Sequence, residues 1–383
     1  MTSATSTPMP LAELDRWLVL CIATLCGIGL LAIASASVDY AETVFGWRWY
    51  HAMKHAVYLV VALFFAIIAY SIPIRFWSQT AWLALLVAIT LLIVVLIPGI
   101  GREVNGAQRW IPLGVVNLQP SEVAKAAVIL FLASYLQRRE DEVRDSWKGF
   151  IKPLVVVGGI GCLLLLEPDF GATVIVVGTA LGMLFLAGVR LVQFFIVAGS
   201  LALLGAAMVA YAPYRLKRFL AYQDPWSDPF NSGFQLTQSL IAFGRGELSG
   251  VGLGQSVQKL FYLPEAHTDF VFSIWAEETG FIGAAGLLVL FAILVARLFW
   301  WSRRALSVGR AFESHVFAGI ALMLSGQVFV SMGMSMGLLP TKGLTLPMIS
   351  FGGSSLIVTL CLMAIALRMT RESLTPEPRR PSL

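Results

Sequence analysis

The sequence predicts an all-α polytopic membrane protein with about ten transmembrane helices. Of its 383 residues, 58% are hydrophobic and only 13% are charged, whereas a soluble domain carries about 25% charged residues. The mean hydropathy is +0.80. Apolar runs of about 20 residues, each long enough to cross a bilayer as a helix, recur along the whole chain. This composition excludes a soluble globular class.

Ten apolar runs support this prediction. Residues 1–16 are expected to form a cytoplasmic N-terminal tail, residues 17–370 a ten-helix membrane domain and residues 371–383 a cytoplasmic C-terminal tail. Both tails are rich in Pro, Ser and Thr, which is typical of disorder. The first run lacks a small-residue cleavage site, so we expect it to stay as a span. The runs lie at 17–36, 53–71, 76–97, 120–137, 151–167, 170–187, 190–211, 270–297, 313–337 and 345–368.

The distribution of Lys and Arg predicts the orientation of the chain. An even number of spans puts both termini on the same side of the membrane. Sixteen Lys and Arg residues fall on that side and five in the opposite short loops. The positive-inside rule therefore assigns both termini to the cytoplasm. Because the basic residues gather at the ends of spans, the basic balance does not indicate nucleic-acid binding.

Two outward segments are too long to be simple turns. One is 98–119, which contains GREVNGAQRWIPLG, and the other is a large extracytoplasmic loop, 212–269, between helices 7 and 8. A connection as long as the second is normally functional or disordered. Aromatic and apolar residues occur throughout it. We therefore expect it to be ordered and partly pressed against the membrane.

The stretch LPEAHTDFVFSIWAEETG, Leu263–Gly280, concentrates ionisable groups at the outer end of the eighth span. Asp269 is the candidate general base, because the apolar residues that follow it would raise its pKa toward the working pH. The alternative is a helix N-cap. His267 is expected to tune Asp269 or bind substrate, or else to be a hydrogen-bonding loop residue. Glu277 and Glu278 are expected to pair with cations from other spans.

The sequence QPSEVAKAA places Glu122 and Lys125 at the start of the fourth span. Their i, i+3 spacing puts both side chains on one helix face. Ionisable residues within a span are costly and usually indicate function. The pair is therefore expected either to line a substrate cavity in the outer leaflet or to form a self-neutralising ion pair that supports packing.

Basic residues on the outward side are candidates for binding a phosphate or pyrophosphate group, because guanidinium groups can donate two parallel hydrogen bonds. The alternative is contact with anionic lipid headgroups. The candidates for substrate binding are Arg102, Arg109, Arg215, Lys217 and Arg218.

Two glycine-rich runs have structural interpretations. The glycines between Gly244 and Gly254 lack the Lys-Ser/Thr pair of a nucleotide-binding loop, so they indicate turns and close backbone approach. The run ISFGGSSL, Ile349–Leu356, places small residues in the tenth span, where close helix packing is expected.

Taken together, LPEAHTDFVFSIWAEE, NGAQRW with QPSEVAK, EPDFGAT and LPMISFGGSSL resemble the SEDS family of shape, elongation, division and sporulation proteins. The resemblance covers about residues 15–370. Ala266 before His267 makes the chain more similar to the division branch than to the rod-elongation branch, whose members tend to have Arg there.

This resemblance implies a peptidoglycan glycosyltransferase of the cytoplasmic (inner) membrane. Such a protein polymerises lipid II at the outer face of that membrane, here at the division septum. Asp269 matches the family's essential aspartate, and Glu122 and Lys125 match its intramembrane pair. The implied partners are a class B penicillin-binding protein, which crosslinks the peptides, and other membrane proteins of the division machinery. The resemblance also implies help from a divalent cation, Mg²⁺ or Mn²⁺. No metal-ligand cluster is visible in the sequence, so no cofactor is assigned.

Two other functions compete with this one. A flippase for lipid II would also use many spans and an intramembrane charged pair, but it needs polar groups along a path through both leaflets. This sequence concentrates its charges at the outer end. A scaffold without catalytic activity would position the crosslinking enzyme and would not depend on Asp269.

Overall fold

The computed structural model describes residues 14–373 except 105, 115 and 341–342. The predicted tails, 1–16 and 371–383, lie almost entirely outside the described residues. The long helices are α1 (Arg16–Phe45), α2 (Tyr50–Ser71), α3 (Ile74–Val95), α4 (Pro120–Asp145), α5 (Trp147–Leu166), α6 (Phe170–Leu186), α7 (Leu191–Ala210), α10 (Val271–Ser307), α11 (Ala311–Ser335) and α12 (Gly353–Ser373).

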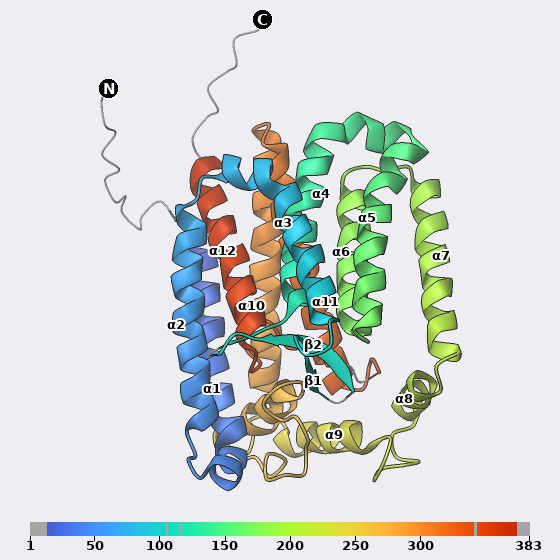
Figure 1. Ribbon diagram of the computed structural model, residues 1–383. Coiled ribbons are helices and arrows are strands. Elements are labelled where there is room, and N and C mark those ends of the chain that lie inside the picture. Colours follow the sequence, from blue (N-terminus) through green and yellow to red (C-terminus); the bar gives the residue numbers. More distant parts are fainter. Residues whose placement is uncertain (1–13, 105, 115, 341–342, 374–383) are drawn as a thin grey trace, which may run out of the picture.

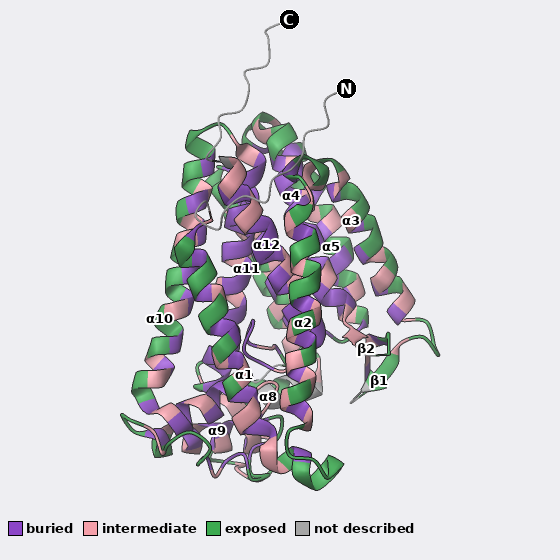
Figure 2. Ribbon diagram, turned by 90° about the vertical axis from the view of Figure 1, so that its left-hand side faces the viewer, coloured by how far each residue is buried: buried purple, intermediate pink, exposed green. Residues whose placement is uncertain are grey.

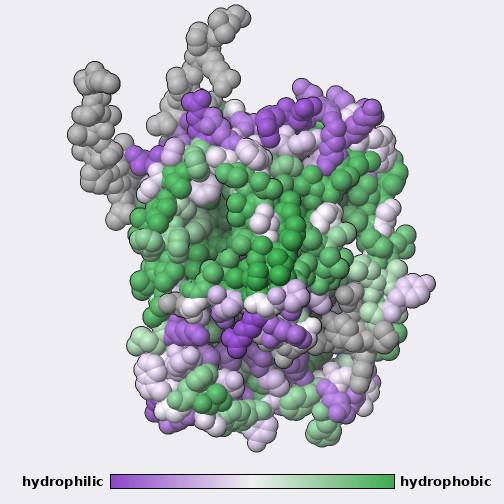
Figure 3. All heavy atoms as spheres, viewed as in Figure 1, coloured by the Kyte–Doolittle hydropathy of each residue, from purple (hydrophilic) through white to green (hydrophobic). Residues whose placement is uncertain are grey.

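The helices run alongside one another across an apolar belt. Within the described part of the chain, eight helices are long and apolar enough to cross a membrane. The other two of the predicted ten are α6, which is apolar but has 17 residues, and α4, whose inner end is charged. A hydrophobic band separates two polar ends (Figure 3). The chain is therefore a multi-pass helical membrane protein, as predicted.

The described chain ends and the long segment 212–269 lie at opposite ends of the bundle (Figure 1). We call this segment the outer segment, and its end of the bundle the outer end, after the orientation that the sequence predicts. That segment contains two short helices, α8 (Pro213–Gln223) and α9 (Phe234–Gly246), which connect α7 to α10. The segment predicted as a loop over 212–269 thus contains two helices, and turns follow α9 up to α10. At the edge of the bundle, α7 is exposed or half-buried along its length, and Gln193 is the buried residue of this fully described helix.

A small antiparallel sheet, which the helical prediction did not include, covers part of the same end. Its strands are β1 (Arg102–Val104), β2 (Ala107–Pro112) and β3 (Asn117–Leu118), in the order β1-β2-β3. Arg102 lies opposite Trp110, and Ile111 lies opposite Leu118. The strands follow directly after α3 and lead into α4, so the sheet closes the outer end of that helix pair (Figure 1).

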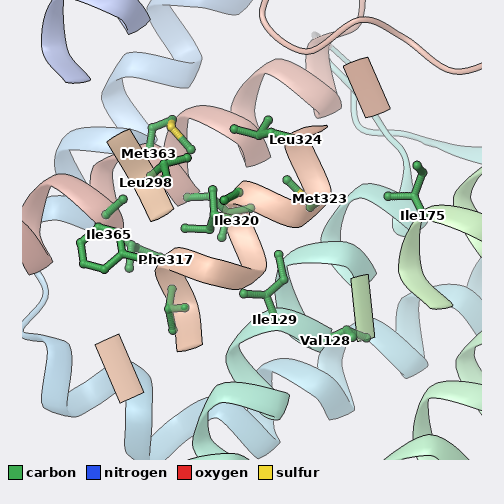
Figure 4. Packing of buried hydrophobic residues seen from close by; sticks show 14 of the residues in the cluster. Val128, Ile129, Ile175, Leu298, Phe317, Ile320, Met323, Leu324, Met363 and Ile365 are labelled. Atoms are coloured by element: carbon green, nitrogen blue, oxygen red, sulfur yellow. The ribbon is translucent and has the colours of Figure 1, made fainter. Parts of the chain in front are cut away.

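The core is centred on α11, most of whose residues are buried. Its side chains Phe317, Ile320 and Leu324 pack among residues of α4, α10 and α12 (Figure 4). The outward faces of peripheral helices such as α2 and α10 are exposed (Figure 2). This distribution is the one a bilayer favours, because apolar side chains can face lipid while polar side chains are buried or placed at the ends.

One span boundary was wrong. The tenth span was expected to begin at 345, but α12 begins at Gly353. Residues 347–352 form turns, in which the Ser350 hydroxyl accepts a hydrogen bond from the backbone N–H of Leu346 (2.9 Å). The backbone N–H of Phe351 donates to the carbonyl of His267 (3.0 Å) instead of to a helical neighbour. Pro347 and the pair Gly352 and Gly353 favour this break over a continuous helix.

Candidate active site

Asp269 lies in a tight turn just before α10. The backbone N–H groups of Thr268 and Phe270 both donate to the carbonyl of Glu265 (3.2 Å each). Phe270 and Leu263, on the apolar side of the turn, belong to a buried cluster. Asp269 itself is half-buried. Because Phe270 occupies the N-cap position of α10, Asp269 stands one residue further out than a helix cap.

His267 fixes this turn from a second direction. Its ring lies 4.7 Å from that of His51 and 5.3 Å from that of Tyr40, measured between centroids. Its carbonyl accepts the hydrogen bond from Phe351. Burial lowers the pKa of His267 to about 4, so its imidazole is neutral near pH 7. The ISFGGSSL run therefore holds the Asp269 turn through Phe351, a contact that the helix-packing interpretation did not include.

The segment that precedes this run contacts Asp269 directly. A Cβ atom added to Gly343 would lie 3.2 Å from Oδ2 of Asp269, so the carboxylate rests against the Gly343 backbone. The next residue, Leu344, packs against Gly171 near the start of α6. Residues 343–344 thus place the N-terminal end of α6 close to Asp269.

Glu122 and Lys125 form the ion pair that their spacing predicts. Nζ of Lys125 lies 2.8 Å from Oε2 of Glu122, and their side chains are 2% and 7% exposed, respectively. Pro120 occupies the first turn of α4 and starts the helix at the outer end. The hydroxyl of Ser354 accepts a hydrogen bond from the backbone N–H of Gln119 (2.9 Å). The chain around Phe351 and Ser354 therefore contacts both the Asp269 turn and the start of α4.

Arg109 already makes contacts within the protein. Its guanidinium, on β2, donates from Nε to the carbonyl of Glu167 (3.1 Å) and from Nη2 to the carbonyl of Pro168. These bonds tie the sheet to the turn between α5 and α6. Arg102, on β1, is exposed. Arg109 is thus held as a structural donor, whereas Arg102 faces solvent.

The remaining basic candidates lie on α8. Arg215, Lys217 and Arg218 fall within its helical range, and their side chains lie outside the described residues. Their predicted role in substrate binding stays a prediction.

Glu167 is a buried carboxyl group that the sequence interpretation did not single out. It is fully buried, and neither carboxyl oxygen has a hydrogen-bond partner among the described residues. Burial raises the pKa of Glu167 to about 8, and the nearby Asp169 raises it further while Arg109 opposes the shift. Glu167 is therefore protonated near pH 7. Its position in EPDFGAT, directly after an apolar run, was the signal that could have identified it.

Two histidines of α2 were also missed. His51 and His55 are buried, and their ring nitrogens make no hydrogen bond with any described residue. Phe351 packs against both rings, at 5.0 Å and 6.1 Å between centroids. Their i, i+4 spacing at the outer end of a span was a legible sign that they share one helix face.

The structure offers no ready metal site in its described part. There, no three His, Cys, Asp or Glu side chains converge as metal ligands. Because Mg²⁺ is often held by only one or two carboxylates together with phosphate groups of a substrate, the divalent cation that the resemblance implies stays a prediction.

Comparison with known proteins places this arrangement in a family. Residues 16–374 match the family model of FtsW, RodA and SpoVE, described as cell cycle proteins. The chain is 52% identical over 357 residues to the probable peptidoglycan glycosyltransferase FtsW of Hahella chejuensis, covering 92% of this chain and 89% of that protein. It is 49% identical over 363 residues to the protein of the same name from Coxiella burnetii, covering 94% and 96%.

Solved structures share the fold. One, reported as the structural coordination of polymerization and crosslinking by a peptidoglycan synthase complex, has a TM-score of 0.77 at 34% identity and covers 95% of this chain and 99% of that one. The crystal structure of the rod shape determining protein RodA of Thermus thermophilus has a TM-score of 0.70 at 30% identity, covering 94% and 98%.

Proposed function

Because this chain belongs to the FtsW, RodA and SpoVE family of cell cycle proteins and is a peptidoglycan glycosyltransferase, we propose that it polymerises lipid II into β-1,4 glycan strands during cell division. Lipid II is a disaccharide-peptide carried on undecaprenyl pyrophosphate. The observation that carries the proposal is the position of Asp269, half-buried at the outer end of the bundle, in a turn fixed by contacts from three directions.

Asp269 acts as the general base in this proposal. The acceptor sugar hydroxyl attacks the anomeric carbon of the donor while its proton passes to the Asp269 carboxylate. The bond from that carbon to the pyrophosphate oxygen breaks, and undecaprenyl pyrophosphate leaves with the electron pair. One displacement inverts an α-linked donor to a β-linked product. A positioned base contributes about 10²- to 10⁴-fold to such a proton transfer.

Positive charge at the outer end would stabilise the leaving pyrophosphate. Exposed Arg102 is the described candidate, and Arg215, Lys217 and Arg218 of α8 are proposed to share this role. Lys125 lies closer to the helix core and is paired with Glu122. We propose that Glu122 and Lys125 line the substrate site from α4 and that His267 contributes to substrate binding beside Asp269.

An apolar groove fits the lipid part of the substrate. It has a volume of about 350 Å³ and is lined by apolar side chains of α3, α4 and α12. Val123 and Ala126, which directly follow Glu122 and Lys125 in the chain, line it. A polyprenyl chain can enter such a groove from the bilayer while its pyrophosphate stays at the polar end.

The same proposal covers orientation and partners. We propose that both termini lie in the cytoplasm. The excess of basic residues on their side supports this orientation, and the described chain ends lie at the end of the bundle opposite the long segment 212–269. A class B penicillin-binding protein is the proposed partner, supported by the similarity to a structure of a peptidoglycan synthase complex. The proposed location is the division septum, together with other membrane proteins of the division machinery.

Incubating the purified full-length chain with lipid II in detergent tests this function. An enzyme forms glycan polymer there, whereas a flippase has no compartments between which to move lipid II, and a scaffold makes no product. We expect polymer with release of undecaprenyl pyrophosphate. Lipid II that remains intact, both alone and with the crosslinking partner added, would contradict the proposal.

A further inference from the structure

Two adjacent carboxylates near the start of α10 have no part in the proposed reaction, yet both are fully buried. Glu277 and Glu278 are 0% and 2% exposed. Glu277 accepts hydrogen bonds from the hydroxyl of Ser256 and from the backbone N–H groups of Val257 (3.2 Å) and Gln258 (3.3 Å). Nε of Arg245 lies 3.5 Å from it. Arg245 and these donors belong to the long outer segment. The sequence had predicted cations from other spans instead.

Glu278 is the centre of a second group, which we call the Glu278 cluster and define as Glu278, Lys259 and Ser35. Nζ of Lys259 lies 3.1 Å from Oε1 of Glu278. The Ser35 hydroxyl, on α1, lies 2.5 Å and 2.7 Å from the two carboxylate oxygens. Lys259 also donates to the carbonyl of Gly254 (2.7 Å). The Lys259 ammonium group is therefore occupied by contacts within the protein, although its position in the outer segment would also suit a cation that binds substrate.

The backbone around the two glutamates is tied to the same segment. The N–H groups of Val251 and Gly252 donate to the carbonyls of Glu277 and Glu278 (3.0 Å each). The helix is interrupted at Gly280, which has φ +68°. Beyond the break, the N–H of Phe281 donates to the carbonyl of Glu247 (2.8 Å). Residues 247–252 thus lie against the first turns of α10.

From the Glu278 cluster the outer segment continues along α1 to the active site. Ala36, next to Ser35, packs with Leu263 and Phe270. One turn further, Tyr40 contacts the rings of Phe261 (6.2 Å) and His267 (5.3 Å). The chain from Lys259 to Asp269 is therefore fastened to α1 at both ends and in the middle.

We propose that the Glu278 cluster is a positioning device, which fixes residues 254–270 against α1 and thereby sets the orientation of the Asp269 carboxylate. This inference rests on the proposed role of Asp269. Glu278, Lys259 and Ser35 are positioning residues, because they act through the turn and not on substrate. Buried ion pairs often contribute little net stability, and in some proteins they specify a single geometry. Displacing a base by about 1 Å can slow a reaction by about 10²-fold.

The test is Lys259→Met in the full-length chain, with glycan polymerisation from lipid II in detergent as the readout. We expect kcat to fall about 10- to 100-fold while KM stays within about twofold, because substrate contacts are kept. Ser35→Ala, which removes only a hydroxyl, is expected to lower kcat in the same direction and keeps the test decisive where the Met variant does not fold.

Arg297→Met is the matched control. Nε of Arg297 lies 2.7 Å from Oδ2 of Asp15, so this pair also joins α10 to α1, but at the other end of both helices. We expect a lower thermal midpoint with kcat close to that of the unaltered chain. The proposal is overturned if Lys259→Met and Ser35→Ala keep the original kcat, or if Arg297→Met lowers kcat as much as they do.

Asp269→Asn, measured in parallel, distinguishes a failure of the positioning proposal from a failure of the proposed general base. An inactive Asp269→Asn together with full kcat in Lys259→Met overturns the positioning proposal alone. An Asp269→Asn chain that polymerises at the original rate overturns the proposed base and, with it, the positioning of that base.

Discussion

At the scale of single residues, two carboxyl groups near the outer end of the bundle differ in their surroundings. Asp269 is half-buried in a turn at the start of α10, whereas Glu167 is fully buried between α5 and α6. Burial favours the neutral form of a carboxyl group. Glu167 is thus held as a neutral acid next to Asp169, which caps α6 through the backbone N–H of Ala172 (3.1 Å).

Glu167→Gln is expected to change how stability depends on pH. The folded chain keeps the Glu167 proton up to a pKa of about 8, while the unfolded chain releases it near the ordinary glutamate pKa of 4.5. The folded state therefore binds more protons across this window, and stability falls as pH rises through it. The Gln variant lacks this loss. Thermal midpoints measured in detergent from about pH 5 to about pH 9 should diverge and then run parallel; curves that are parallel throughout would contradict the assignment.

Breaking the buried pair of α4 from one side is expected to be more damaging than removing it. Lys125→Met leaves the Glu122 charge buried without its cation, which costs about 3–5 kcal/mol because both side chains are almost fully buried. Glu122→Gln combined with Lys125→Met removes both charges and should recover most of that stability. The thermal midpoints of the single and double variants, measured against that of the unaltered chain, check this difference in stability.

Activity of the double variant then decides between the two interpretations of the pair. If Glu122 and Lys125 form part of the substrate site, the double variant is stable but polymerises lipid II poorly. A stable double variant with the original polymerisation rate would show that the pair only supports packing.

At the scale of elements, the break in α10 joins the long outer segment to the bundle. A Cβ atom at Gly280 would lie 2.4 Å from the backbone nitrogen of Gly250, and one at Gly250 would lie 2.1 Å from the carbonyl oxygen of Glu278. Both residues have positive φ, +68° and +80°. The two glycines therefore allow two backbones to meet, as the glycine-rich sequence predicted.

Gly280→Ala is expected to separate these backbones. The strained backbone conformation alone costs about 1–3 kcal/mol, and the contact with Gly250 adds to it. Gly286→Ala, in the same helix, is the control, because a Cβ there meets nothing within 4 Å. The measurement is the thermal midpoint together with protease cleavage between α9 and α10. Equal behaviour of the two alanine variants would argue against the backbone contact.

Much of the element-level structure followed from the sequence, because apolar runs of about 20 residues are a strong signal. Each expected run overlaps a helix of the described chain, although the tenth run begins before α12. The strands were missed because they have three, six and two residues, too few for an alternating pattern to stand out. The start of α12 was placed too early because Phe351 bonds to His267, a contact between residues 84 positions apart that hydropathy does not encode.

The candidate site was predictable to a similar degree. The spacing of Glu122 and Lys125 predicted their ion pair, and the density of carboxylates indicated the stretch that contains Asp269. Composition does not show which partner a charge will meet, so the cations of Glu277 and Glu278 came from the loop, and Arg109 was found bonded to carbonyls. Glu167 and the α2 histidines were missed because their chemistry depends on burial in the folded chain.

At the scale of the whole molecule, the polar chemistry is placed at one end of an apolar bundle. The Asp269 turn, the sheet and the outer segment share the end opposite the described chain termini (Figure 1). A lipid-carried substrate can reach this end without leaving the bilayer, since its polyprenyl chain stays in the apolar belt (Figure 3). An extracytoplasmic polymerase acting on a membrane-bound donor needs this arrangement, whereas a flippase needs polar groups through both leaflets.

The rate at which purified Asp269→Asn polymerises lipid II tests the central claim most directly. Asn has nearly the size of Asp but cannot accept the proton at neutral pH. We predict that the variant keeps the thermal midpoint and lipid II binding of the unaltered chain while polymerisation falls by about 10²-fold or more. Long glycan strands made at the original rate by a folded Asp269→Asn protein would contradict the account.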